Sequence, residues 1–244
     1  MERKDLHIHT VFSDGENTPE EMVLAAIEAR LDTIGFSDHS YTAFDESWCM
    51  KKKKISAYRN EIARLRDKYR DKITIMCGIE QDYYSEEPTA GYDYVIGSVH
   101  YLKIGDNYVP VDESAEILID AAEKYFGGDM YALADVYYST VSDVVQKTGA
   151  DIIGHFDLIT KFNEQTKLLD ENDPRYRASW RRTADELLKT GVPFEINTGA
   201  MSRGYRTSPY PSAEIQDYIL AKGGKLVLSS DSHSACALCQ GFKD

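Results

Sequence analysis

The stretch Asp5-Leu6-His7-Ile8-His9-Thr10-Val11-Phe12-Ser13-Asp14-Gly15 carries the pattern from which we predict both the fold and the site of this chain. It has the character of a short strand that runs out into a loop. Because side chains alternate along an extended strand, His7 and His9 are expected on one face. Leu6 and Ile8 are expected on the opposite face. Two imidazoles about 6–7 Å apart along a strand can bind one metal ion. The pair is weak evidence alone, so its meaning depends on the rest of the chain.

The composition is that of a globular protein of 244 residues, a length that suits one domain covering residues 1–244. The net charge of -13 argues against tight binding of nucleic acid, which depends on basic surfaces. No long apolar run predicts a membrane span, and the N-terminus lacks the apolar core of a signal peptide. The four cysteines show no disulfide framework. We therefore expect a cytoplasmic protein.

Strand-like and helix-like segments alternate along the chain. The expected strands cover about residues 4–9, 33–37, 73–79, 94–99, 151–154, 192–197 and 225–230. The expected helices cover about residues 19–30, 51–70, 113–126, 130–147, 174–189 and 212–221. A hairpin is expected around Gly105-Asp106-Asn107, and Thr198–Pro211 is expected to form a long loop. Seven β-then-α units in series predict a parallel barrel of the TIM kind with one unit fewer, and a doubly wound sheet is the alternative.

All six histidines fall at or just past the end of an expected strand, and so do two acidic residues. They are His7, His9, His39, His100, His155 and His233, with Glu80 and Asp231. The carboxyl ends of barrel strands converge on one rim, where active sites are built. Imidazoles and carboxylates without paired thiolates suit zinc, manganese or iron. The number of ligands exceeds the need of one ion, which favours two or three ions that share a carboxylate. Such clusters suit in-line displacement at phosphorus.

Several short motifs resemble those of the polymerase-and-histidinol-phosphatase (PHP) superfamily and occur in the order typical of that family. They are His7-Ile-His9, Ser13-Asp14-Gly15, Ser37-Asp38-His39, Gly78-Ile-Glu80, Gly97-Ser-Val-His100, Gly154-His155-Phe-Asp157 and Ser230-Asp231-Ser-His233. Further segments are similar to the histidinol-phosphatase branch. These are residues 97–102, 154–159 with 161–163, and 195–198 with 209–212.

The resemblance implies a distorted (β/α)7 barrel, TIM-like and of a single domain, with a site for three metal ions. Ion by ion, the implied ligands are His7, His9, Glu80 and Asp231; Glu80 again with His100 and His155; and His39, His233 and Asp14. Some relatives carry a histidine in the first loop, where this chain offers Asp14 instead. Asp38 and Asp157 are interpreted as residues that orient imidazoles or shape loops, with a helix cap or turn as the alternative.

The phosphate of a substrate also needs cationic partners. Arg203 and Arg206 lie in the long loop after the sixth strand, and Lys161 comes after the motif around His155. Since a guanidinium can bind two phosphate oxygens, these three residues are the predicted substrate-binding residues. Arg203 is also predicted to be catalytic, together with Glu80 and Asp231. At the sixth strand, positions 195 and 197 share a face and are read either as pocket residues or as a packed polar pair.

The predicted reaction is hydrolysis of L-histidinol phosphate to L-histidinol and phosphate, in histidine biosynthesis, by a hydroxide held between metal ions. The nearest alternative is a PHP phosphoesterase for another small ester, such as a nucleotide, a sugar phosphate or phosphotyrosine. A nuclease or proofreading module is disfavoured by the acidic charge. A metal amidohydrolase is disfavoured because Glu80 stands where a carboxylated lysine would be expected. A non-enzymatic metal-binding protein is the least favoured, since every ligand position is filled.

The segment after the seventh strand is short. The sequence ends eleven residues after His233, whereas members of the family that the chain resembles usually continue with a further helix. A strand without its covering helix would leave apolar surface for a second copy to cover. A homo-oligomer is therefore the expected assembly, beside a small phosphorylated substrate as the only other partner.

Overall fold

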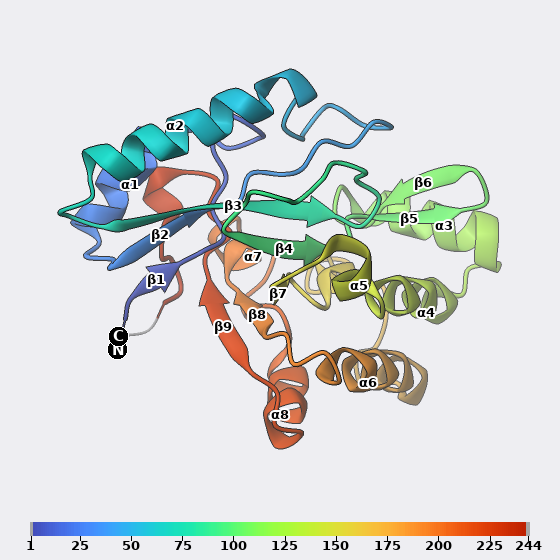
Figure 1. The fold of residues 1–244 in the computed structure, drawn as a ribbon. Helices are drawn as coiled ribbons and strands as arrows, with labels where there is room; N and C mark the ends of the chain where they lie inside the picture. Colours follow the sequence, from blue (N-terminus) through green and yellow to red (C-terminus); the bar gives the residue numbers. More distant parts are fainter. Residues whose placement is uncertain (1, 243–244) are drawn as a thin grey trace.

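Seven parallel strands form the central sheet of the computed structural model, which describes residues 2–242 (Figure 1). They are β1 (Lys4–Asp5), β2 (Thr33–Phe36), β3 (Thr74–Asp82), β4 (Tyr94–Ser98), β7 (Ile152–Ile153), β8 (Phe194–Asn197) and β9 (Leu226–Ser229). Their order in the sheet is the same as their order in the chain. A doubly wound sheet would reverse this order at a switch point, so the barrel prediction is confirmed and the alternative is wrong.

The two edges of the sheet approach each other just beyond the ends of β1 and β9. Ile8 and Ser232 form a parallel bridge there. The His9 N–H donates to the Ser232 carbonyl at 2.9 Å, and the Ser232 N–H donates to the His7 carbonyl at 3.2 Å. These bonds nearly close the barrel at the level of the first two histidines.

The first strand is shorter than residues 4–9, because only Lys4–Asp5 pairs along a neighbouring strand. Leu6 and Ile8 consequently do not share one environment. Leu6 packs with Tyr94, whereas Ile8 packs among side chains of α1 and α2. The expectation that both point to one face is wrong, since the backbone leaves the regular strand after Asp5.

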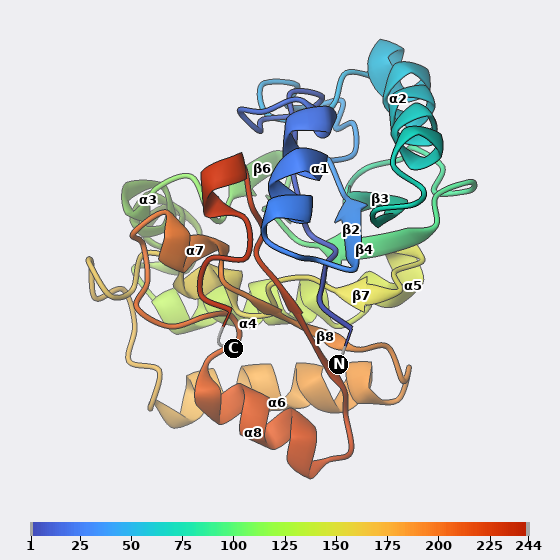
Figure 2. The ribbon, with the colours of Figure 1, turned by 90° about the vertical axis from the view of Figure 1, so that its left-hand side faces the viewer.

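Helices cover the outside of the sheet, with α1 and α2 on one side and α4, α6 and α8 away from them (Figures 1 and 2). The helices after β1 and β2 are α1 (Pro19–Glu28), η1 (Lys52–Lys54) and α2 (Ile55–Lys68). Those after β4 are α3 (Ala115–Phe126), α4 (Met130–Val141) and α5 (Val144–Thr148). Those after β7, β8 and β9 are η2 (Leu158–Thr160), α6 (Pro174–Leu188), α7 (Gly199–Ser202), α8 (Ala213–Ala221) and η3 (Ala235–Ala237).

Local sequence explains where α1 begins. The Thr18 hydroxyl accepts a hydrogen bond from the Glu21 N–H, and the Glu21 carboxylate accepts one from the Thr18 N–H. This capping box satisfies two N–H groups at the helix start, and Pro19 occupies the first turn, where its missing N–H costs nothing.

Several expected elements differ from those observed. The expected helix over 130–147 is broken into α4 and α5, because the backbone at Asp143 leaves helical geometry with ψ near 14°. The connection between β3 and β4, residues 83–93, contains no helix, so the seven units are not all β-then-α. The long loop Thr198–Pro211 contains the short helix α7. The hairpin is confirmed as β5 (Tyr101–Ile104) and β6 (Asn107–Pro110).

After β9, the described residues contain only the single turn η3 as a further helical element. Ala235, Leu238 and Cys239 pack against the apolar cluster under α1 and α2. The side chains of Leu226 and Leu228 in β9 are only half-buried. The last two residues, 243 and 244, lie outside the described part of the chain. No helix within residues 2–242 is both long and apolar enough to cross a lipid bilayer.

Tyr94 links β4 to the backbone at Leu6 and Phe36, beneath the end of the barrel that carries the histidines. It is buried in β4, and its hydroxyl lies 2.5 Å from the Leu6 carbonyl and 3.1 Å from the Phe36 carbonyl. The ring can reach across because two neighbouring strands carry glycine. A Cβ at Gly35 would lie 2.4 Å from the hydroxyl oxygen, and one at Gly78 would lie 2.3 Å from the ring. The interior is therefore filled beneath the site.

We predict that Tyr94→Phe lowers the free energy of unfolding by about 1–3 kcal/mol, because two buried carbonyls lose their donor. Urea unfolding followed by circular dichroism measures this change. Tyr125→Phe, at a half-buried position in α3, is the control and should stay within about 0.5 kcal/mol of the parent. Equal stability of both variants would show that the hydroxyl does not tie the strands together.

Candidate metal centre

The six histidines come from the ends of five strands and gather at one end of the barrel. His7 and His9 come after β1, and the others come after β2, β4, β7 and β9: His39, His100, His155 and His233. The rings stand close together, with centroids 5.1 Å apart for His7 and His9 and 4.2 Å apart for His9 and His39. The first two imidazoles lie together as expected, although the regular strand ends at Asp5.

Glu80 lies at the centre of this group and is fully buried. Five imidazole nitrogens lie within 3.5 Å of its two oxygens. On Oε1 they are His155 Nε2 at 3.0 Å and His100 Nε2 at 3.3 Å; on Oε2 they are His39 Nδ1 at 2.8 Å, His7 Nε2 at 3.2 Å and His9 Nε2 at 3.5 Å. A carboxylate with imidazoles on both oxygens has the arrangement of a ligand shared between two ions.

The first group of donors fits one metal ion. Asp231 Oδ1 lies 3.1 Å from His9 Nε2 and 3.6 Å from His7 Nε2, beside Glu80 Oε2. Ligand atoms around a tetrahedral zinc ion are separated by roughly 3.3 Å, given bonds of about 2.0–2.1 Å. The Nε2 atoms of His7 and His9 and Oε2 of Glu80 are buried and have no hydrogen-bond partner. Buried nitrogen and oxygen atoms that lack a hydrogen-bond partner and lie this close together are suitable ligands for a cation.

A second group lies nearer the outer surface, around Asp14. Its Oδ2 is 3.2 Å from His233 Nε2, and its Oδ1 is 3.6 Å from His39 Nε2 and 3.8 Å from His9 Nδ1. These four residues form one cluster of potential ligands. Asp14 thus lies where the resemblance placed it, and His9 presents its second ring nitrogen to this group.

His39 faces two groups of donors as well. Its Nδ1 points to Glu80, and with His100 these residues form a third cluster of potential ligands. The resemblance assigns His100 and His155 to the second ion. It assigns His39 to the third ion only. The geometry brings His155 to the same Glu80 oxygen as His100, so both sets of neighbours meet at this carboxylate.

Two carboxylates behind the histidines hold their rings in place. Glu195 Oε1 lies 2.5 Å from His7 Nδ1, and its Oε2 accepts hydrogen bonds from the His155 N–H and the Asn197 amide. Asp82 Oδ2 lies 3.3 Å from His100 Nδ1. A carboxylate on the far nitrogen fixes the tautomer and turns the other nitrogen toward a metal. Glu195 and Asn197 are therefore a packed polar pair that supports the site.

Asp82 was missed by reasoning from the sequence, although it lies two residues after Glu80 on the same face of β3. The two other acidic residues expected behind the site do not touch an imidazole. Asp38 accepts from the backbone N–H groups and hydroxyls of Thr10 and Ser13, and so shapes the first loop. Asp157 accepts from the Ser212 N–H.

Nearby carboxylates raise the pKa of three histidines. Burial disfavours the charged form of His7, but the charges of Glu195 and Glu80 outweigh burial and raise its pKa well above the ordinary value. Burial also acts against the charged forms of His39 and His100. The charges of Glu80 and Asp14 at His39, and the charge of Glu80 with the hydrogen bonds to Asp82 and Glu80 at His100, together outweigh burial and raise the pKa of both. Burial raises the pKa of Glu80, but the positive charges of His7, His39 and His100 outweigh burial and lower it well below the ordinary value. Without metal, protons on these imidazoles balance the buried carboxylate.

His9 behaves differently, since burial and the charges of His233 and His39 lower its pKa to about 3. Its imidazole is therefore neutral at physiological pH, which is the form that binds metal. Burial raises the pKa of Asp14, but His39 and His233 outweigh it and lower that pKa.

The three predicted cationic residues have different positions. Arg203 reaches the centre, with Nη2 3.2 Å from Asp231 Oδ2 and Nη1 2.9 Å from His233 Nδ1. Lys161 faces the same cavity, where its Nζ donates to the Asp112 carbonyl at 2.7 Å. Arg206 is buried outside the cavity lining.

Arg206 makes its contacts within the protein instead. It donates to the Thr160 side chain and stacks 4.9 Å above the centre of the Tyr210 ring. Its side chain is packed behind the metal centre rather than facing it, which the loop sequence does not reveal.

The cavity above the metal centre measures about 450 Å³. His39, His100, Glu80 and Asp231 form its floor, and further lining comes from Trp48, Tyr101, Lys161, Arg203 and Tyr205. A site of this volume admits one small molecule.

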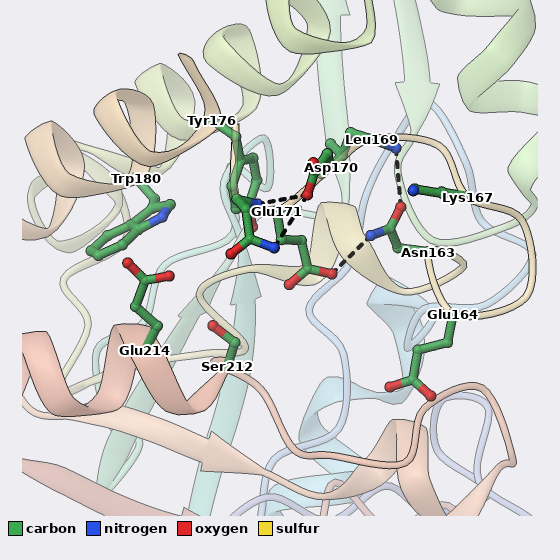
Figure 3. Close-up of a pocket in the computed structure, with 11 residues that line it drawn as sticks. Asn163, Glu164, Lys167, Leu169, Asp170, Glu171, Tyr176, Trp180, Ser212 and Glu214 are labelled. Carbon is green, nitrogen blue, oxygen red and sulfur yellow. Dashed lines mark hydrogen bonds between the residues drawn. The ribbon is translucent and has the colours of Figure 1, made fainter. Parts of the chain in front are cut away.

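A hollow of about 530 Å³ lies elsewhere on the surface, between the segment 163–172 and the helices α6 and α8 (Figure 3). Its acidic side chains are already paired. Glu171 accepts from Asn163, Glu214 pairs with Arg177, and Glu164 accepts from Thr207. None of the nine potential metal ligands lines it, so the chemistry belongs to the smaller cavity.

Adjacent clusters of imidazole and carboxylate on the rim of a seven-stranded barrel, beside an arginine, are typical of metal-dependent phosphoesterases. The family model described as PHP domain matches residues 5–199. The chain belongs to the PHP family, as the motifs predicted.

Three proteins illustrate the similarity. A histidinol-phosphatase of Bacillus subtilis is 29% identical over an alignment 267 positions long, and the match covers 96% of this chain and 95% of that protein. A Listeria monocytogenes structure, provisionally named as a histidinol phosphatase, is 21% identical with a TM-score of 0.82 and covers 98% of both chains. Histidinol phosphate phosphatase of Lactococcus lactis, solved with zinc, L-histidinol and phosphate, is 24% identical with a TM-score of 0.71, covering 96% and 87%. The predicted barrel and an enzyme of the phosphatase class are confirmed.

We predict that Glu195→Gln weakens metal binding by about 10- to 100-fold, because an amide cannot accept from all three groups that the carboxylate serves. Metal retained after dialysis against a chelator, measured by mass spectrometry, checks this. Glu186→Gln on the exposed surface of α6 is the matched control. If Glu195→Gln retained as much metal as the control, the carboxylate would not support the centre.

A second prediction concerns pH. Below the raised pKa values of His7, His39 and His100, protons compete with metal ions for the ring nitrogens. Metal affinity should therefore rise with pH, by roughly tenfold per unit for each proton displaced. Calorimetric titration of zinc into the metal-free protein, in buffers of different ionisation heat, counts the protons released. An affinity that is constant between about pH 6 and 8, with no proton release, would contradict the pKa assignment.

Proposed function

We propose that this protein hydrolyses L-histidinol phosphate to L-histidinol and inorganic phosphate, at a centre of two or three divalent metal ions. The observation that carries the proposal is the buried Glu80 carboxylate with imidazoles on both oxygens, at a small cavity that Arg203 also lines. A relative named histidinol-phosphatase, matched over 95% of its own length, supports this choice of substrate.

The residues of the centre have separate tasks in this proposal. Glu80 and Asp231 supply the buried negative charge that would hold the ions, and the histidines complete the ligand set of each cluster. Bound divalent ions supply Lewis acidity, which activates water near neutral pH and offsets charge on a phosphoryl group. We assign Arg203 to the phosphate oxygens, because its guanidinium is already oriented by Asp231 and His233.

The other two cations have distinct roles in the proposal. We assign Lys161 to a phosphate oxygen on the side of the cavity away from the metal ions. Its ammonium group lines the cavity and could leave Asp112 to bind a substrate oxygen. Arg206 is now assigned a supporting role, because it is 6% exposed and lies outside the cavity lining. Zinc, manganese and iron all suit the donors.

A PHP phosphoesterase for another small ester is the alternative candidate. The enclosed metal centre would accept the phosphate of a nucleotide or a sugar phosphate equally well, and only the outer walls of the cavity would distinguish them. A polynucleotide is disfavoured by the net charge of -13.

We further propose that residues 1–244 form one domain, that the protein acts in the cytoplasm, and that it self-associates. Residues 1, 243 and 244 lie outside the described part.

We predict that Glu80→Ala removes bound metal and lowers kcat for histidinol phosphate by about three orders of magnitude or more. Both effects should appear together, because the carboxylate serves more than one ion. Elemental analysis and phosphate release measure them on the same sample, with the exposed Glu86→Ala as the control.

Full turnover by a Glu80→Ala protein would contradict the proposed mechanism. The substrate is tested separately with the unaltered enzyme and a panel of esters: histidinol phosphate, a sugar phosphate, a nucleotide, phosphotyrosine and single-stranded DNA. The proposal expects the highest kcat/KM for histidinol phosphate. A clear preference for another ester would support the alternative.

A further inference from the structure

Two members of the outer cluster come from segments that are far apart in the chain. The outer cluster is the group of potential ligands His9, Asp14, His39 and His233. Asp14 lies in the first loop, residues 10–17, and His233 begins the closing turn, residues 233–237. Asp14 Oδ2 is 3.2 Å from His233 Nε2. The cluster therefore keeps its shape only while these two segments hold their positions relative to each other.

The first loop is folded tightly back on itself. The Val11 N–H donates to the Asn17 carbonyl at 3.0 Å, which closes the loop. A Cβ at Gly15 would lie 2.5 Å from the carbonyl carbon of His9, so only glycine fits at this close approach. The loop is thus a compact unit, and its hydrogen bonds to other segments decide where it stands.

Two hydrogen bonds join the first loop to the closing turn. The Glu16 N–H donates to the His233 carbonyl at 2.8 Å, and Asn17 Oδ1 accepts from the Ala235 N–H at 2.8 Å. The first bond involves backbone atoms only. The second depends on the side chain of Asn17. Apart from the contact between Asp14 and His233, it is the one side-chain hydrogen bond between these two segments in the part of the chain that the structure describes.

Helix α1 supports both segments. Asn17 directly precedes Thr18, the N-cap of α1, so the capping box fixes the backbone next to it. The closing turn ends in η3, which lies beside α1 (Figure 2). Ala235 of this turn packs against the apolar cluster that includes Met22 and Val23 of α1. The Asn17 side chain therefore connects the start of α1 with the turn that carries His233.

We propose that Asn17 is a positioning residue for a metal ion in the outer cluster. Its side chain joins the first loop to the closing turn, and so it fixes the distance between Asp14 and His233 and raises the affinity of this one ion. The inference rests on the proposed function, because it requires that one of the proposed ions binds at the outer cluster. The ligands supplied by β3, β4 and β7 make no hydrogen bond to Asn17 within the described residues, so ions held there should bind as before.

The test measures zinc affinity rather than turnover. Zinc is titrated into the metal-free full chain in competition with a chromogenic chelator, which gives the affinity of each equivalent bound. Asp14→Ala identifies the equivalent of the outer cluster, because it removes a ligand there. We expect Asn17→Ala to weaken that same equivalent by roughly 3- to 10-fold, since one hydrogen bond is lost. The other equivalents should stay within about twofold, which also shows that the variant is folded.

Two further variants show whether the hydrogen bond itself matters. Ala235→Pro removes the N–H that donates to Asn17, at the first residue of η3, where proline is tolerated. In the Ala235→Pro background, Asn17→Ala should change the affinity by less than about twofold, because the bond is already absent. Asn60→Ala, at an exposed position in α2, is the matched control and should bind zinc like the unaltered protein.

Equal zinc affinities in Asn17→Ala and Asn60→Ala would overturn the inference. A loss shared by every equivalent, or a full further loss in the Ala235→Pro background, would overturn it as well, because either result indicates a general effect on the fold. If Asp14→Ala lost no equivalent, the outer cluster would hold no ion, and the inference would fail while hydrolysis at a two-ion centre around Glu80 would stand. A different preferred ester would overturn the proposed substrate and leave the zinc result intact.

Discussion

The charge of one buried carboxylate, Glu80, is the constraint on which the rest of the site depends. An ionised carboxylate without water or a partner is costly inside a protein. Here its two oxygens face five imidazoles, and no lysine or arginine is paired with it in the described residues. The charge is therefore balanced either by protons on the imidazoles or by metal ions. The histidines, the carboxylates behind them and the closure of the barrel all serve to keep this group together.

The barrel provides that arrangement through simple rules of strand geometry. Ligands come from the ends of separate strands, so no single loop has to hold them all. Glu80 and Asp82 occupy one face of β3, where the first meets the metal positions and the second orients His100. Glu195 does the same for His7 and also holds the backbone of His155. Tyr94 is buried below them and fills the space against Gly35 and Gly78.

The sequence predicted the order of the strands and the position of every histidine, because both depend on local periodicity and on the short distance between a strand end and the next residue. The split between Leu6 and Ile8 could not be predicted, since it depends on the pairing of β1 with its neighbour. The burial of Arg206 could not be predicted from the sequence either. A loop that is rich in glycine and arginine does not reveal which guanidinium packs behind a tyrosine and which one reaches the cavity. The Tyr101 hydroxyl is hydrogen-bonded to Asp45 and to Trp48, which lie more than fifty residues earlier in the chain, and tertiary structure alone brings these residues together.

If Glu80 is a shared ligand, the ions that bind at this centre are close neighbours. The electron paramagnetic resonance spectrum of the protein loaded with manganese measures this directly. Ions a few ångströms apart, joined through one carboxylate, should give a broad, spin-coupled spectrum once more than one ion per chain is bound. A spectrum with the six sharp lines of isolated manganese at every loading would show that the ions are not neighbours, and would contradict a centre built around Glu80.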